Sequence, residues 1–361
     1  MNQNVLSAWL MLARAHVLHS TQVRRVLLRL RDPIRLVETF NQHAFPPSIV
    51  KRFSATRHTF DFDKEQALLQ KQNVHVLSWT CDAYPVLLKE IHDPPPLLFY
   101  KGSLPTPSQV LISMVGSRRA TAYGHTVTSR LAGDLTRMGF GIVSGLALGI
   151  DGDAHKAALS QGGYTLAVLA GGLDEACLSP SFHIPLARDI LAADGCLVSE
   201  HPIGTAAEAH NFPQRNRIVA GLSRATIVVE AALKSGSLIS ADCALAENRE
   251  VCAVPGMVTS DRSAGTHALI RQGATLVTCA NDVLEVIDLE ASQTAQVISN
   301  HTLHDPTEQR ILNELDHEPT LMDDLSRTLT MPVTDLAGHL TLMELKRLVL
   351  ILPGGYITRV V

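Results

Sequence analysis

The segment NFPQRNR, residues 211–217, combines side chains that suit a phosphate backbone with unpaired bases. Its two guanidinium groups can pair with phosphate oxygens, and its aromatic ring offers a flat face on which a base can stack. The segment lies between a strand-like run ending at Glu200 and a second run, residues 225–230. In an alternating strand/helix protein this order places it at the carboxyl edge of the sheet, where such folds bind ligands. The candidate contacts are Asn211, Phe212, Arg215, Asn216 and Arg217.

A second candidate loop, VGSRRATAYG over residues 115–124, follows another strand-like run. Backbone N–H groups at a helix start attract phosphate, and glycines let a ligand approach the backbone closely. The G-x-G-x-x-G pattern of dinucleotide-binding folds is absent. Two arginines occupy the loop instead, which suits several phosphates in a row, although an ordinary turn with exposed arginines would have the same sequence. The candidate contacts here are Gly116, Ser117, Arg118 and Arg119.

The turn SGLALGIDGDAH, residues 144–155, adds Ser144 and Gly145 to the same predicted edge. Asp151 and His155 lie four residues apart and so share one helix face, a spacing that invites a metal or acid–base hypothesis. A metal would need a third and a fourth ligand, and none is evident nearby. We therefore interpret Asp151 as a helix cap and His155 as a residue that packs or bonds locally. We predict no metal site and no cofactor.

A further turn, residues 230–237, ends a strand and begins a helical pattern. Lys234, Gly236 and Ser237 supply a positive charge, a hydroxyl group and free N–H groups, which together make an anion site. With residues 211–217 and the loop 115–124, three loops at one sheet edge bring positive charge. Together they predict a basic groove.

Short apolar runs alternate with helical patterns between residues 108 and 287. Continuously apolar strands separated by helices indicate a parallel sheet covered on both faces. We therefore predict an α/β fold with a doubly wound, mostly parallel, Rossmann-like sheet, in a domain spanning residues 76–290. The strand-like runs are Val110–Val115, Phe140–Val143, Thr165–Leu169, Cys196–Val198, Ala225–Val229, Val251–Val254 and Thr275–Val277.

Both flanks are predicted to be separate modules. Residues 1–75 show short helical patterns broken by prolines and no strand alternation, so we expect a helical domain there. The segment Tyr84–Lys101 is interpreted as a bridge. After a polar linker, residues 291–304, the segment 305–361 shows three helical patterns and a hairpin, which is the order of a winged helix.

Composition restricts the class of protein. The six cysteines form no C-x-x-C pair, which favours reduced thiols in a cytoplasmic protein over disulfides or a zinc site. The apolar run Val5–Leu12 lacks the flanks of a secretory signal, and no apolar run reaches about 18 residues, so we expect no membrane span. The net charge of −4 is uneven: residues 1–60 carry a local +7 and residues 281–361 a local −8. Only the basic end would attract a polyanion. A solvated helical face would explain the cluster of basic residues equally well.

Residues 108–287 resemble the DNA-processing protein A family, also called DprA or Smf. The resemblance rests on VGSRRATAYG, SGLALGIDGDAH, NFPQRNR, VVEAALKSGSLI, and VPG followed by GTHALIRQGA, which occur in this order. It implies an extended Rossmann fold between an N-terminal helical domain, of the SAM-like type, and a C-terminal winged helix. It also implies a homodimer without enzymatic activity that binds and protects single-stranded DNA. That DNA would then be loaded with the RecA recombinase during natural transformation.

Two positions depart from the family pattern. Leu148 stands where the family commonly has an arginine, and Ser179 precedes a proline where the family has an aromatic residue. Both departures put the shape of the groove and its affinity in doubt.

Some residue assignments keep an alternative. Arg119 and Arg217 could form ion pairs with Glu230 or Asp151 instead of contacting DNA. Phe212 could anchor its loop against the sheet instead of stacking on a base.

Two other functions are weaker alternatives. A Rossmann-like nucleoside-monophosphate phosphoribohydrolase would use a P-G-G-x-G-T-x-x-E loop, and residues 230–237 lack both the P-G-G and the following glutamate. A winged-helix transcription factor is disfavoured because the expected recognition helix has only Lys346 and Arg347, at its far end.

Overall fold

A computed structural model describes residues 2–287, 306–315, 320–345, 349–352 and 355–359. The chain forms two compact units, residues 1–288 and 289–361. The predicted linker, residues 291–304, lies outside the described residues.

Five helices form the N-terminal part of the first unit, and prolines begin two of them. Pro33 and Pro47 each occupy the first helical turn, where the missing N–H is not needed and the fixed φ suits a helix. The rings of Phe40 and Phe53 stack in the core with centroids 3.8 Å apart. The helices are α1 (Gln3–Arg14), α2 (Thr21–Leu30), α3 (Pro33–Thr39), α4 (Pro47–Thr59) and α5 (Phe62–Lys71).

Nine strands form one sheet in the order β1-β2-β6-β5-β4-β3-β7-β8-β9. All neighbouring pairs from β6 to β9 are parallel. The chain builds the sheet from β3 to β6 in one direction and then places β7 on the other side of β3, so the switch point lies between β3 and β7. The strands of this parallel part are β3 (Leu111–Val115), β4 (Gly141–Ser144), β5 (Thr165–Val168), β6 (Cys196–Ser199), β7 (Ala225–Val228), β8 (Glu250–Ala253) and β9 (Thr275–Leu276). The predicted doubly wound sheet is confirmed.

Two strands at the other end of the sheet were not predicted. The segment interpreted as a bridge contains a short helix, α6 (Val86–Glu90), and a strand, β2 (Leu97–Gly102). β2 pairs antiparallel with β6 and with β1 (His75–Ser78). A row of prolines precedes β2 and is typical of an irregular linker, so the local sequence does not indicate a strand there.

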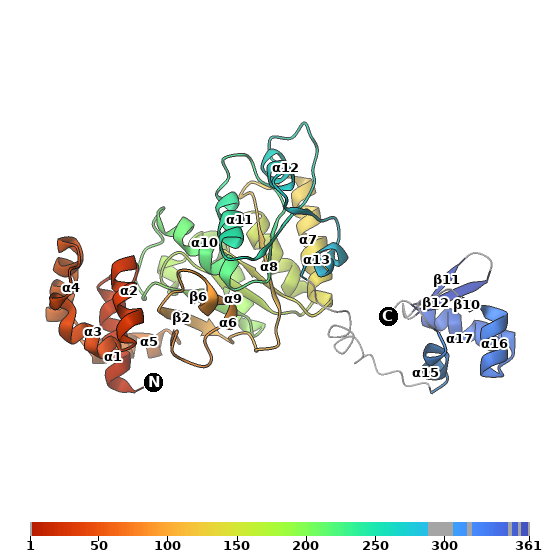
Figure 1. The fold of residues 1–361 in the computed structure, drawn as a ribbon, viewed down its shortest axis with the longest axis horizontal. Helices are drawn as coiled ribbons and strands as arrows, with labels where there is room; N and C mark the ends of the chain where they lie inside the picture. Colours follow the sequence, from red (N-terminus) through yellow and green to blue (C-terminus); the bar gives the residue numbers. More distant parts are fainter. Residues whose placement is uncertain (1, 288–305, 316–319, 346–348, 353–354, 360–361) are drawn as a thin grey trace. The chain divides into compact units, whose positions relative to one another are not determined.

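Helices cover both faces of the sheet (Figure 1). α7 packs on α8 and α8 on α9, whereas α10 packs on α6 and α11. Because crossovers between parallel strands are right-handed, helices that connect strands on the two sides of the switch point cover opposite faces. The helices are α7 (Ala122–Arg137), α8 (Ile150–Ser160), α9 (Ile184–Ala192), α10 (Asn211–Gly221), α11 (Gly236–Ala246), α12 (Ala264–Arg271) and α13 (Ala280–Val286).

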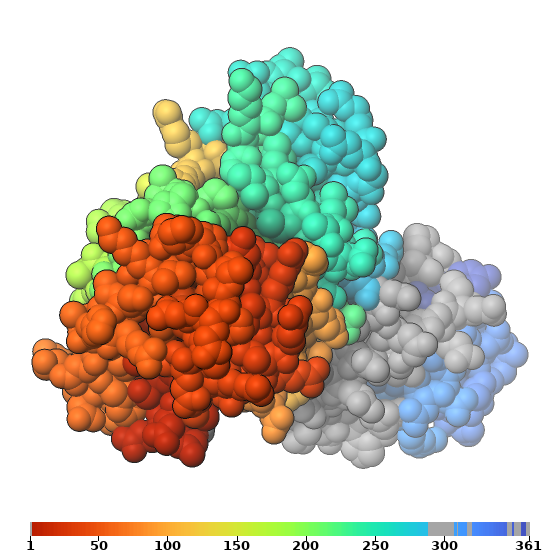
Figure 2. Space-filling view, turned by 60° about the vertical axis from the view of Figure 1, so that its left-hand side comes forward, coloured from red at the N-terminus to blue at the C-terminus, as the bar shows by residue number. Residues whose placement is uncertain are grey.

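The N-terminal helices pack directly on the sheet domain (Figure 2). Arg14 at the end of α1 donates a hydrogen bond to the carbonyl of Ile203, 2.9 Å away. On α2, Arg24 pairs with Asp93 at 2.8 Å. Among the described residues, no helix combines the length and the apolar character needed to cross a membrane.

The second unit is a winged helix, as predicted. Its three strands form an antiparallel sheet in the order β10-β12-β11, and β10 was not predicted. The helices bury a leucine-rich core that includes Leu325, Leu336 and Leu340. The elements are α15 (Pro306–Asn313), β10 (Thr320–Leu321), α16 (Met322–Leu329), α17 (Val333–Leu345), β11 (Val349–Leu352) and β12 (Tyr356–Arg359).

Candidate nucleic-acid interface

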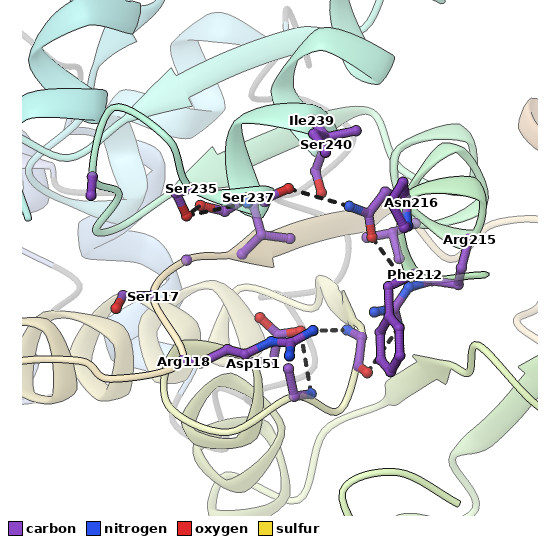
Figure 3. Close-up of a pocket in the computed structure, with 18 of the residues that line it drawn as sticks. Ser117, Arg118, Asp151, Phe212, Arg215, Asn216, Ser235, Ser237, Ile239 and Ser240 are labelled. Carbon is purple, nitrogen blue, oxygen red and sulfur yellow. Dashed lines mark hydrogen bonds between the residues drawn. The ribbon is translucent and has the colours of Figure 1, made fainter. Parts of the chain in front are cut away.

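A cleft of about 610 Å³ opens at the carboxyl ends of β3 and β7, beside the switch point of the sheet (Figure 3). Its walls come from the loops after β3, β4 and β7, from the first turns of α10 and α11, and from the loop before α12. The cleft is lined by five cationic side chains and one carboxylate: Arg118, Arg119, Arg215, Lys234, Arg262 and Asp151. It is therefore a basic site at the position where α/β sheets bind ligands.

The structure brings most of the predicted contacts to this cleft. The predicted residues that line it are Gly116, Ser117, Arg118, Arg119, Gly145, Phe212, Arg215, Asn216, Lys234, Gly236 and Ser237. They come from four segments far apart in the sequence.

Phe212 lies in the first turn of α10 and faces the cleft (Figure 3). The ring is half-buried, and the guanidinium carbon of Arg118 lies 5.0 Å from its centroid. A cation at this distance interacts favourably with the π-face of the ring. Arg118 is exposed, so it can turn toward a ligand and leave the ring accessible.

Arg215 forms the floor of the cleft. It is 4% exposed, and its Nη1 donates hydrogen bonds to the carbonyl of Gly145 at 2.8 Å and to that of Val168. A Cβ at Gly145 would lie 2.4 Å from the guanidinium nitrogens, so glycine leaves room for Arg215. Burial lowers the pKa of Arg215 to about 10, so the side chain stays charged at pH 7. Its charge therefore acts on the cleft mainly from below.

Asp151 opposes this buried positive charge. Its carboxylate accepts hydrogen bonds from the N–H groups of Gly145, at 3.1 Å, and Ala147, at 3.4 Å. Burial raises the pKa of Asp151, and the charge of Arg215 opposes that shift. The predicted helix cap is wrong in detail, because Gly149 occupies the cap position and Asp151 bonds the loop before it.

The N-terminus of α11 forms the opposite wall. Ser235 is the N-cap, and its Oγ accepts from the N–H of Ser237 at 3.3 Å. A Cβ built at Gly236 would meet no atom within 4 Å, so the wall is open there. Lys234 is exposed, and Asn216 joins α10 to this wall through its Nδ2, which donates to the carbonyl of Gly236 at 3.4 Å. Positive charge and a helix N-terminus together favour the binding of an anion at this wall.

Arg262 is a lining residue that the sequence analysis missed. It precedes α12, and its Nη1 donates to the Oγ of Ser117 at 2.9 Å. The signal that could have identified it is a basic side chain in the loop after β8, because that loop leaves the same carboxyl edge as the other walls.

Arg217 is not brought to the cleft. Its guanidinium pairs with Glu200 at 2.7 Å and with Asp93 at 3.3 Å, and the side chain is 14% exposed. Burial would lower its pKa, but the two carboxylates raise it. The anticipated ion pair exists with different partners, since Glu230 instead accepts hydrogen bonds from the N–H and hydroxyl of Thr121.

Two other predicted contacts, Ser144 and Asn211, are buried behind the cleft. The Oγ of Ser144 donates to the carbonyl of Met114 at 2.6 Å, and Asn211 donates to the carbonyl of Ala206 at 3.4 Å. Both side chains therefore support loops. His155 also packs internally, as expected, with its Nδ1 2.7 Å from the hydroxyl of Thr165. Leu148 is 42% exposed and is not among the lining residues.

Comparisons with known proteins identify the family of this chain. A family model described as DNA recombination-mediator protein A matches residues 75–288, and a DprA winged helix domain matches residues 294–355. The chain belongs to the DprA family. It is 38% identical to Protein Smf of Escherichia coli K12 over 296 residues, which cover 80% of this chain and 78% of that protein. It is 42% identical to the DNA processing protein DprA of Bacillus subtilis over 220 residues, which cover 61% and 73%.

Two solved DprA structures have the same fold. The DprA of Streptococcus pneumoniae has a TM-score of 0.66 and 32% identity, covering 80% of this chain and 99% of that chain. The DprA of Helicobacter pylori has a TM-score of 0.52 and 28% identity, covering 59% and 94%. The Helicobacter structure is described as showing a single-stranded DNA binding mode of that protein.

Proposed function

We propose that this chain binds single-stranded DNA in the basic cleft, protects it, and loads the RecA recombinase onto it during natural transformation. The observation that carries this proposal is the gathering of Arg118, Arg119, Lys234 and Arg262 in one open cleft that Phe212 also lines. A relative in the same family is described as binding single-stranded DNA.

Two interactions would contribute to DNA binding in the cleft, charge neutralisation and base stacking. The exposed cationic groups and the N-terminus of α11 would neutralise successive phosphates, which supplies most of the affinity. Phe212 would stack on one base, which requires that the base be unpaired. Because stacking is tolerant of base identity and no base-reading element lines the cleft, we expect little sequence preference.

The deciding experiment compares single- and double-stranded DNA of equal length in binding titrations across a salt series. The proposal predicts tighter binding of the single strand and a linear loss of affinity with the logarithm of salt concentration. Equal affinity for both forms would contradict the assignment to single strands.

RecA loading, a homodimeric assembly and a cytoplasmic location belong to the same proposal and rest on membership in the DprA family. RecA loading predicts that the chain accelerates RecA filament formation on single-stranded DNA already covered by a single-strand-binding protein. The dimer predicts twice the chain mass in sedimentation equilibrium.

The proposal assigns no catalytic step to the cleft. Its carboxylate, Asp151, is buried and hydrogen-bonded to loop amides, and Glu230 is bonded to Thr121. Both carboxylates thus stabilise loops through these hydrogen bonds. Release of free base from a nucleoside monophosphate would instead support the phosphoribohydrolase alternative.

A further inference from the structure

Three histidines that do not line the basic cleft converge where the N-terminal helices meet the sheet domain. His16, His19 and His201 each offer one ring nitrogen, and these atoms all lie within 4.8 Å of one another. Among the described residues, no other group of three or more His, Cys, Asp or Glu side chains gathers so closely. All three histidines line a cavity of about 770 Å³.

Local backbone structure brings the three rings together. α1 ends at Arg14, and His16 adopts a left-handed backbone with φ of 50°, a conformation that histidine enters more readily than most residues. The turn that follows leads to His19, just before α2. His201 comes from the loop after β6, to which Arg14 also bonds through the carbonyl of Ile203.

His201 has unused binding capacity. It is 3% exposed, and neither of its ring nitrogens has a hydrogen-bond partner among the described residues. Its ring stacks on that of His19 with centroids 4.7 Å apart. Buried polar atoms without a partner destabilise a fold, and a bound cation would satisfy one of them.

A buried carboxylate lies beside the cluster, where Arg52 and Arg217 also contribute positive charge. Glu200 is buried, and its Oε2 lies 3.6 Å from Nδ1 of His19. Histidines that bind metals commonly direct their second nitrogen toward such a carboxylate.

We propose that His16, His19 and His201 bind one divalent transition-metal ion, which fastens the turn between α1 and α2 to the loop after β6. Three imidazole nitrogens suit Zn²⁺ and other divalent first-row transition metals such as Cu²⁺ and Ni²⁺. With Zn–N bonds of about 2.0–2.1 Å, tetrahedral geometry needs nitrogens roughly 3.3–3.4 Å apart. The nitrogens lie within 4.8 Å of one another, so they would close by up to about 1.5 Å. The stacked rings of His19 and His201 would also have to turn toward the ion. A fourth position would face the cavity. No metal site was predicted from the sequence, because His201 is distant in the chain from His16 and His19.

The test uses the full chain without a polyhistidine tag, after treatment with EDTA. Zn²⁺ is titrated in competition with a chromophoric chelator, and Co²⁺ is added separately to record the visible absorption of a tetrahedral site. We expect one equivalent to bind with a micromolar or lower Kd. His16→Gln and His19→Gln should each weaken binding at least tenfold, whereas His75→Gln, an exposed histidine on β1, should leave it unchanged.

Thermal unfolding supplies a second measurement. An ion that binds only the folded chain raises its unfolding midpoint, so Zn²⁺ should raise the midpoint of the wild type and of His75→Gln, but not that of His16→Gln. Because His16 and His19 are half-buried, their variants test the site even if replacing buried His201 prevents folding. Binding at millimolar Zn²⁺ only, or equal affinity in wild type and His16→Gln, would overturn the proposal. These measurements contain no DNA, so their outcome does not depend on whether the chain binds single-stranded DNA.

Discussion

Burial gives three arginines near the cleft three different roles. Arg118 is exposed and rests on Phe212, so it can turn to a phosphate at small cost. Arg215 is held by carbonyl groups beneath the cleft, and Arg217 is taken up by Glu200 and Asp93. A buried guanidinium needs hydrogen-bond partners within the protein. Residue type therefore does not decide which arginine is available to DNA.

Arg118→Ala should weaken binding of single-stranded DNA and reduce the slope of log K against log salt by about 0.7, the value for one phosphate contact. The measurement is a binding titration at several salt concentrations. Arg130→Ala is the matched control, because Arg130 is an exposed arginine of α7 outside the cleft. An unchanged slope in Arg118→Ala would remove this residue from the set of phosphate contacts.

Arg215→Ala should behave differently, because it leaves the buried carboxylate of Asp151 without its counter-charge. It also removes the hydrogen bonds of Arg215 to the carbonyls of Gly145 and Val168. A buried polar group left without a partner costs about 1–3 kcal/mol, so we expect a clear loss of stability in chemical denaturation as well as weaker DNA binding. The double variant Arg215→Met/Asp151→Asn should recover part of the stability. A variant Arg215→Ala as stable as the wild type would contradict a structural role.

Phe212→Ala should lower affinity for single-stranded DNA without changing the salt slope, because stacking releases no counterions. Stacking on one base is worth about 1–3 kcal/mol, or roughly five- to 150-fold in affinity. Phe182→Ala is the control, since Phe182 is 77% exposed and does not line the cleft. Loss of thermal stability with retained affinity would instead identify Phe212 as an anchor of α10.

At the scale of elements, one substitution can test how much the N-terminus of α11 contributes to DNA binding. Gly236→Asp places a carboxylate in the first turn, where it interacts favourably with the helix dipole by about 0.3–1 kcal/mol. The same charge repels a phosphate at the open wall. We therefore expect unchanged or higher thermal stability and at least tenfold weaker DNA binding. Gly236→Asn, nearly identical in shape but neutral, should bind close to wild type, and a similar loss in both variants would indicate a steric effect.

The elements that sequence could predict are those with a local signal. The central strands appear as apolar runs and β3, β4 and β7 are buried along their whole length, and the loops at their carboxyl ends contain most of the cleft. β2 was missed because prolines precede it, and its identity as a strand depends on pairing with β6. The ion-pair partners of Arg217 were missed for a similar reason, since Asp93 is far away in the chain. Contacts set by tertiary pairing leave no local pattern.

At the scale of the whole molecule, charge is divided along the chain. Residues 1–60 have a local charge of +7, whereas the second unit, residues 289–361, has five Lys/Arg and ten Asp/Glu, a charge of −5. The cleft belongs to the first unit, and its cationic residues all lie between residues 118 and 262. On electrostatic grounds we therefore expect the two units to have different partners, because an acidic module is repelled by a polyanion.

A chain that ends at Glu290 should consequently bind single-stranded DNA at least as tightly as the full chain. The acidic module repels a phosphate backbone within about a Debye length, ~8–10 Å at moderate salt, so removing it should leave affinity unchanged or higher, most clearly at low salt. The measurement is a binding titration of both chains, with circular dichroism to show that the shorter one is folded. Binding at least tenfold weaker in a folded truncated chain, a loss of about 1.4 kcal/mol, would instead make the winged helix a DNA-binding element. If the expected result is found, the module is free to contact a protein partner while the cleft holds the DNA.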